Sequence, residues 1–156
     1  MTDYELLLQN ADNEQISIDE TSYFCGTNIK GLYFDNHIAI STDLTTDSQK
    51  RCVLAEELGH HHTSFGDILD QSSVSNRKQE LRARIWGYNK LIGLHGIISA
   101  YKAGCSNSYE VAAHLGVTEE FLLDALKCYR SKYGVYVPCD NYVIYFEPYL
   151  MVLELV

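Results

Sequence analysis

Residues 44–62, LTTDSQKRCVLAEELGHHH, predict a helix whose start and buried face are both defined by the sequence. Thr46 is a typical N-cap residue, and Gln49 three positions later completes a capping box, in which each side chain bonds the backbone N–H of the other residue. The apolar residues that follow at helical spacing indicate the face expected in the core: Val53, Leu54 and Leu58. Because the start of the helix is fixed, its register also decides which polar side chains share a face.

Two side chains that can bind a metal, Glu56 and His60, lie one turn apart on this helix. Residues at i and i+4 face the same way, so the two project side by side, as the ligands of the zinc-protease motif H-E-x-x-H do. Glu56 replaces the first histidine of that motif, and Glu57 occupies the position of its general base. The alternative register, with Glu57 and His61 as ligands, would place Leu58 at the base position, where it could do no chemistry.

A third ligand is expected, because catalytic zinc usually has three protein ligands and one open position for water. A second long helix, predicted over residues 77–93, offers Glu80. Ala83 lies on the same face of that helix, and such a small residue lets two helices approach closely. The predicted ligands are therefore Glu56, His60 and Glu80, together with water.

Two carboxylates and one imidazole are a workable set of metal ligands. Carboxylate oxygen and imidazole nitrogen bind zinc at about the same distance. The extra negative charge should make the bound metal a weaker Lewis acid than a set with two histidines would, and it favours harder ions. We expect one divalent metal, with zinc as the first choice and manganese or iron as alternatives.

The histidines also have a simpler interpretation. Histidines at the C-terminus of a helix are favoured by the helix dipole, so the run in EELGHHH needs no metal. His61 and His62 are assigned to the helix end or to positions behind the ligands. His37, His95 and His114 have no partner at ligand spacing, and each is interpreted as structural.

Composition and charge exclude several classes of protein. The chain has 12 Lys and Arg against 21 Asp and Glu, and its net charge of −9 argues against direct nucleic-acid binding. Its five cysteines contain no CxxC pair, which predicts free thiols and neither a disulfide framework nor a cysteine zinc site. The N-terminus lacks signal-peptide features and no apolar stretch approaches the roughly 20 residues that span a bilayer, so we expect a cytoplasmic protein that does not bind membranes.

The rest of the sequence predicts a single α+β domain, residues 1–156, in three consecutive parts. In the first, about 1–92, a small zincin-like sheet packs on the metal-site helices, which a polar loop over 63–76 connects. The sheet is expected from the following segments: a strand at 15–19 after a helix at 3–12, and a hairpin formed by Leu32–Phe34 and Ile38–Ile40. A helical region (93–134) comes next, and a C-terminal β-hairpin region (135–156) of two or three strands, with a Pro-Cys-Asp-Asn turn, completes the chain.

The sequence resembles the ImmA/IrrE family of metallopeptidases, which occurs in phages, integrative elements and radiation-resistance regulation. The resemblance is strongest over GLYFDNHIAISTDLTTDSQKRCVLAEELGHHHTS (31–64) and NRKQELRARIWGYNKLI (76–92). It continues less specifically through AYKAGCSNSYEVAAHLGVTEEFLLDALKCY (100–129) and DNYVIYFEP (140–148), and therefore covers most of the chain.

By this resemblance, His60 corresponds to the second histidine ligand of the family, Glu57 to its catalytic glutamate and Glu80 to its downstream carboxylate ligand. Glu56 departs from the family's first histidine. The resemblance implies a metal-dependent endopeptidase that cleaves or otherwise inactivates the repressor of a mobile element, so the expected partner is a helix-turn-helix repressor. Glu57 would take a proton from the attacking water, and the candidates for an oxyanion donor are His61, His62 and Tyr88.

Two other functions remain open. The first is a non-catalytic anti-repressor, or another partner-binding protein, whose metal site is degenerate at Glu56. The second is a DNA-binding regulator, because SYEVAAHLGVTEEFLLDALKCY resembles a helix-turn-helix. Acidic residues in its second helix argue against DNA binding, since a recognition helix turns its N-terminal residues toward bases and phosphates: Glu119, Glu120 and Asp124. A packed helical hairpin is the favoured interpretation of this segment.

Overall fold

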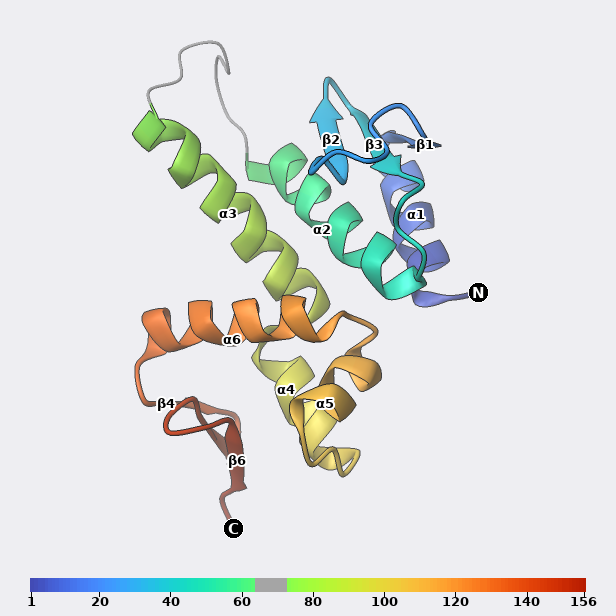
Figure 1. The fold of residues 1–156 in the computed structure, drawn as a ribbon. Helices are drawn as coiled ribbons and strands as arrows, with labels where there is room; N and C mark the ends of the chain where they lie inside the picture. Colours follow the sequence, from blue (N-terminus) through green and yellow to red (C-terminus); the bar gives the residue numbers. More distant parts are fainter. Residues whose placement is uncertain (64–72) are drawn as a thin grey trace. The chain divides into compact units, whose positions relative to one another are not determined.

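The computed structural model describes the backbone of residues 1–63 and 73–156 and is an α+β fold, as predicted (Figure 1). The chain forms two compact units, Met1–Gly87 and Tyr88–Val156, and the expected single domain stays a prediction. Residues 64–72, the centre of the predicted polar loop, lie outside the described residues. The ends of that predicted loop are helical, because α2 extends to Thr63 and α3 begins at Ser73.

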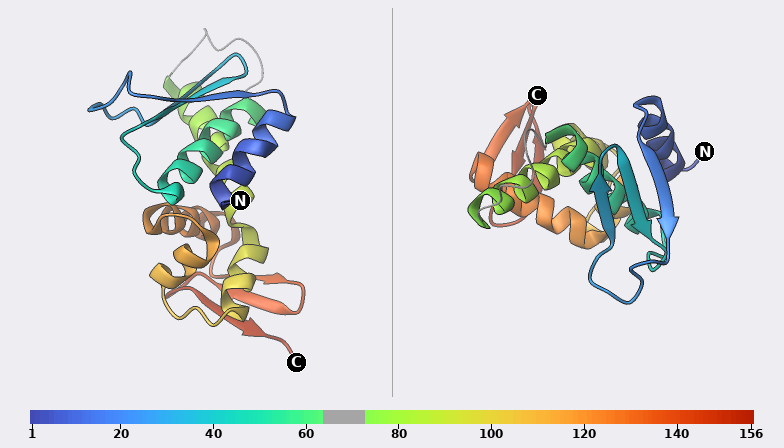
Figure 2. Two further views of the ribbon diagram at one scale, coloured as in Figure 1. Left: turned by 90° about the vertical axis from the view of Figure 1, so that its right-hand side faces the viewer. Right: turned by 90° about the horizontal axis from the view of Figure 1, so that it is seen from above.

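The first unit contains a three-stranded sheet with two helices on one face (Figure 2). Its elements are α1 (Asp3–Asn13), β1 (Ser17–Thr21), β2 (Gly31–Phe34), β3 (His37–Ser41), α2 (Asp47–Thr63) and the first part of α3 (Ser73–Leu91). The predicted hairpin is confirmed: β2 and β3 are antiparallel, and both turn residues, Asp35 and Asn36, have the positive φ angles of a tight hairpin turn. The sequence did not predict that β1 pairs in parallel with β3, so that the strand order is β1-β3-β2 and β2 is an edge.

Helix α2 is held beneath this sheet by its apolar face. Leu54 is fully buried, as are Ile38 and Ile40 of β3, which turn toward the helix layer. The predicted capping box is confirmed. Gln49 N–H donates to Thr46 Oγ1 and Thr46 N–H donates to Gln49 Oε1, each at a distance of 3.2 Å. The start and rotation of α2 are therefore set as the sequence predicted.

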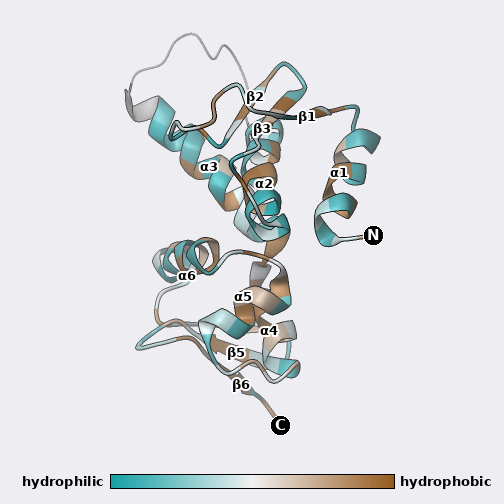
Figure 3. Cartoon of the chain, turned by 45° about the vertical axis from the view of Figure 1, so that its right-hand side comes forward, coloured by the Kyte–Doolittle hydropathy of each residue, from teal (hydrophilic) through white to brown (hydrophobic). Residues whose placement is uncertain are grey.

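Small residues bring α2 and α3 into direct backbone contact. A Cβ atom added to Gly59 of α2 would overlap the backbone of Ala83 in α3, and one added to Gly87 would lie 3.4 Å from the backbone of Ala55. The two contacts pair earlier residues of one helix with later residues of the other, so the helices are antiparallel here. The predicted close approach at Ala83 is confirmed, and it matters because α3 is otherwise mostly hydrophilic (Figure 3).

The second unit combines helices with a separate antiparallel sheet. It contains α4 (Gly93–Lys102), α5 (Ser108–Leu115), α6 (Glu119–Tyr133), β4 (Tyr136–Cys139), β5 (Tyr142–Tyr145) and β6 (Met151–Glu154), in the strand order β4-β5-β6. Of the two or three C-terminal strands predicted, three are present, since β6 pairs with β5 beside the β4–β5 hairpin. The predicted turn is shorter than expected: Pro138 and Cys139 pair within β4, and only Asp140 and Asn141 turn the chain.

Helices α5 and α6 form the packed hairpin that the sequence favoured. Gly116 between them has a φ of 68°, the left-handed conformation that glycine adopts without strain. Val111 of α5 and Leu122 of α6 are buried, whereas Glu119 and Glu120 are exposed at the start of α6. An acidic, exposed end of the second helix is the opposite of what phosphate contact requires.

The contact between α2 and α3 can be tested with two glycine substitutions. Gly59→Ala should lower the free energy of unfolding by about 1–3 kcal/mol or more, because the new methyl group overlaps rigid backbone. Gly87→Ala is the matched control: its methyl group reaches only van der Waals contact, and alanine in a helix is favoured by up to about 1 kcal/mol. Urea unfolding of both variants measures the difference, and equal stabilities would contradict the close approach at Gly59.

Candidate metal centre

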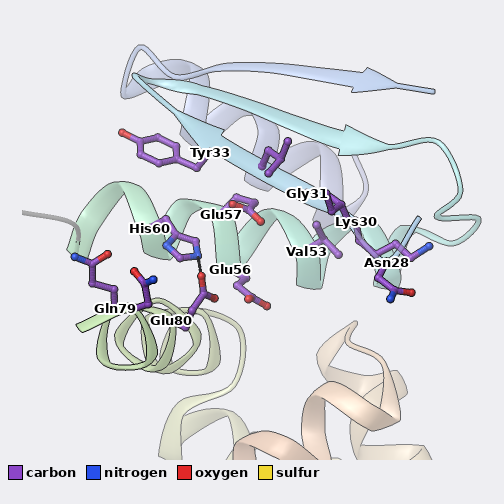
Figure 4. A pocket seen from close by; sticks show the side chains of 13 residues that line it. Asn28, Lys30, Gly31, Tyr33, Val53, Glu56, Glu57, His60, Gln79 and Glu80 are labelled. Atoms are coloured by element: carbon purple, nitrogen blue, oxygen red, sulfur yellow. Dashed lines mark ion pairs between the residues drawn. The ribbon is translucent and has the colours of Figure 1, made fainter. Parts of the chain in front are cut away.

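The three predicted ligands lie together in the first unit (Figure 4). Glu56 and His60 project from α2, Glu80 projects from α3, and their donor atoms all lie within 4.8 Å of one another. His60 Nε2 is 3.4 Å from Glu80 Oε1. Two such donors bound to a tetrahedral zinc ion would be roughly 3.3–3.5 Å apart, given metal–ligand bonds of about 2.0–2.2 Å. The residues present therefore fit a divalent metal.

Arg84 of α3 forms an ion pair with Glu56, one of the three ligand candidates. Its Nε lies 3.6 Å from Glu56 Oε1, one turn after Glu80 on α3. This ion pair balances part of the charge of the two carboxylates when no cation is bound. The sequence interpretation did not include Arg84, although its i+4 spacing from Glu80 places it on the same face of the helix.

Glu57 is the only buried charged residue among the side chains that the structure describes, with 8% of its surface exposed. Burial raises its pKa to about 8, and the negative charges of Glu56 and Glu80 add to this effect. A cation held by those two carboxylates would oppose their effect and favour the ionised form of Glu57. Glu57 is therefore placed as a base beside the donor cluster, while its own oxygens are not part of that cluster.

Gly31 at the start of β2 makes room for Glu57. A Cβ atom added to Gly31 would lie 2.9 Å from Glu57 Oε1 and 2.7 Å from a methyl carbon of Val53, which is closer than real Cβ atoms come. Strand β2 therefore passes directly over the carboxylate. The sequence did not predict this role of Gly31, which was noted only within the segment that resembles the family. A strand residue does not reveal which helical residue it will face.

A pocket of about 680 Å³ opens over these groups (Figure 4). Residues 28–33, in β2 and the loop before it, line one side, and residues of α2 and α3 line the other. Glu56, Glu57, His60 and Glu80 all contribute to the wall. The edge strand of the sheet and the metal-ligand candidates therefore face the same space.

Two of the three candidates for an oxyanion donor, His61 and His62, interact with other side chains. His61 Nδ1 is hydrogen-bonded to the Tyr33 hydroxyl at 2.8 Å, and His62 stacks on Trp86 with its Nε2 2.9 Å from Glu14 Oε2. Neither histidine lines the pocket. Tyr88, the third candidate, belongs to the second unit, where it is buried. Tyr33 does line the pocket, and its hydroxyl is the group that is bonded to His61 Nδ1.

These features define a class of protein: an α+β chain in which one helix carries two candidate metal ligands and a buried base, and a second helix carries a third candidate ligand. Residues 14–127 match the model of the peptidase family described as the IrrE N-terminal-like domain, and the chain belongs to that family. This confirms the resemblance seen in the sequence. No curated protein and no solved structure gave a match. Among the described helices, none has the length and apolar character needed to cross a membrane.

Removing a ligand should remove metal from this centre. His60→Ala and Glu80→Ala should each lower the bound divalent metal by about one equivalent per chain, because two remaining donors hold a metal poorly. Glu56→Ala should weaken binding in the same way, since Glu56 is the third donor. Equilibrium dialysis followed by elemental analysis measures the loss, with the exposed His37→Ala as control. Full metal retention in both His60→Ala and Glu80→Ala would reject the site.

Glu57 should make the stability of the metal-free protein depend on pH. Its pKa of about 8 in the folded chain exceeds the ordinary value of 4.5, so between these values the folded state binds more protons than the unfolded state. Stability should therefore fall as pH rises through this window. The side chain of Glu57→Gln cannot ionise. The free energy of unfolding of this variant should therefore exceed that of the wild type at pH 8 by on the order of a few kcal/mol, and the two values should converge below about pH 4.5. Urea unfolding with a chelator tests this, and parallel profiles would contradict it.

Proposed function

We propose that this chain is a metal-dependent endopeptidase. The observation that carries the proposal is the buried Glu57 beside a convergent Glu56, His60 and Glu80 in an open pocket. Membership of a peptidase family supports the same conclusion. Zinc is the metal we expect, and the two carboxylates leave manganese and iron as alternatives.

Each residue then has a defined part in peptide hydrolysis. Glu56, His60 and Glu80 would hold the cation. When bound, a divalent cation supplies Lewis-acid polarisation of a carbonyl group and makes a nearby water more acidic. A carboxylate oxygen of Glu57 accepts a proton from the attacking water and returns it to the leaving amine. Tyr33 lines the pocket and is our candidate for steadying developing negative charge, with its hydroxyl held by His61 in the absence of substrate.

An extended protein segment is the substrate that suits the pocket. Strand β2 is an edge, so its outer backbone groups can pair with an added strand, and the same strand borders the ligand candidates. By the family resemblance, this segment belongs to a mobile-element repressor of the helix-turn-helix type. Direct binding of DNA by this chain is not part of the proposal, because the start of α6 is acidic and exposed.

Glu57→Gln separates a peptidase from a protein that inactivates the repressor by binding alone. The substitution keeps the size of the side chain but removes the base, and loss of a general base costs about 10²–10⁴ in rate. The variant should bind metal and fold but fail to cleave a helix-turn-helix repressor that the wild-type chain cleaves, as followed by electrophoresis and mass spectrometry. Glu120→Gln, at an exposed position of α6, is the control and should cleave normally.

The same experiment addresses the anti-repressor alternative. A binder would inactivate the repressor equally well in cells with wild-type chain and with Glu57→Gln, and no fragment would form. That pair of results would overturn the peptidase proposal.

A further inference from the structure

A second group of metal-binding side chains lies in the other unit of the chain. His95 comes from the first turn of α4, Cys139 from the end of β4 and Asp140 from the turn that follows. His95 Nε2 is 3.1 Å from Asp140 Oδ2 and 3.9 Å from Cys139 Sγ. The three donor atoms all lie within 4.8 Å of one another.

The geometry of this group is that of a ligand set and differs from that of a catalytic relay. In a nucleophile–histidine–carboxylate triad, the two partners of the histidine bond different ring nitrogens, so that one proton can pass along the chain of groups. Here the thiol and the carboxylate both approach the same nitrogen, Nε2 of His95. One nitrogen cannot relay a proton between them, but a cation can accept all three donors at one point.

The distances also agree with a zinc ion. With bonds of about 2.0–2.2 Å to nitrogen or oxygen and 2.3 Å to sulfur, tetrahedral donors lie roughly 3.3–3.5 Å apart for N and O and roughly 3.5–3.6 Å for N and S. The observed 3.1 and 3.9 Å differ from these by only a few tenths of an ångström. A small adjustment of exposed side chains brings all three into range, since His95 is 80% and Asp140 67% exposed.

We propose that His95, Cys139 and Asp140 form a second site, for zinc or a similar thiolate-binding divalent ion, that clamps the β4–β5 turn to the first turn of α4. The clamp joins residues 44 positions apart in the sequence. Thiolate and imidazole together select zinc over calcium or magnesium, which prefer oxygen donors. With three protein donors, one position stays open to water.

This site is separate from the candidate catalytic centre. Its three residues all belong to Tyr88–Val156, whereas Glu56, His60 and Glu80 all belong to Met1–Gly87. Two of its donors, Cys139 and Asp140, lie beyond residues 14–127, the segment that matches the family. The proposal therefore stands whether or not the chain is a peptidase.

Cobalt distinguishes the two sites, because Co²⁺ occupies zinc sites and shows a near-ultraviolet charge-transfer absorption when a thiolate binds it. The catalytic centre offers only Glu, His and Glu, so this absorption reports on the Cys139 site alone. When the chain of residues 1–156 is titrated with Co²⁺, the absorption should reach the intensity of one bound ion per chain. His60→Ala should retain this absorption. Cys139→Ser and His95→Ala should lose it.

Cys105→Ser is the matched control, because Cys105 is a half-buried free thiol of the same unit and belongs to no ligand group among the described residues. It should keep the full absorption. No absorption in the wild type at saturating Co²⁺, or full absorption in Cys139→Ser, would overturn the proposal.

Thermal unfolding gives a second measurement that does not depend on the absorption of cobalt. Zinc should raise the Tm of His60→Ala, in which the catalytic centre is disabled, because a ligand that binds only the folded state stabilises it. Zinc should not raise the Tm of the double variant His60→Ala/Cys139→Ser. Equal shifts in the two proteins would overturn the proposal.

Discussion

The close approach of α2 and α3 is the constraint on which the candidate centre depends. Gly59 against Ala83, and Gly87 against Ala55, leave no side chain between the two backbones. Only at that separation can the short reach of Glu80 meet the imidazole of His60 at 3.4 Å. A bulky pair at this crossing would move the helices apart by more than a metal–ligand bond can stretch. Packing and chemistry are therefore set by the same few small residues.

This arrangement brings negatively charged groups close together, which is electrostatically unfavourable. Three carboxylates surround one pocket, and one of them, Glu57, is almost completely buried without a cationic partner of its own among the described contacts. Arg84 balances part of the charge at Glu56 from the outer side. Protonation of Glu57 relieves the rest at neutral pH, and a cation held by Glu56 and Glu80 would favour its ionised form instead.

Local signals in the sequence predicted the parts of the site that lie on one element. The capping box fixed α2, i and i+4 spacing placed Glu56 beside His60, and Ala83 indicated the close side of α3. Non-local features were missed because no spacing encodes them. Neither Gly31 over Glu57 nor Tyr33 in the pocket can be read from the sequence, since each depends on how β2 crosses α2. His95 was assigned a structural role because its neighbours Cys139 and Asp140 lie more than 40 positions away.

Strand β2 is open along one edge, and that openness does not distinguish among incoming chains. Leu32 and Phe34 are exposed on it, so its surface is apolar as well as unpaired. A second copy of this protein, or any unfolded chain, can therefore compete for the same row of backbone groups. The strand has only four residues and follows Lys30, and both features limit aggregation at sheet edges. Resistance to self-association and access for an extended chain are thus opposing demands on one short segment.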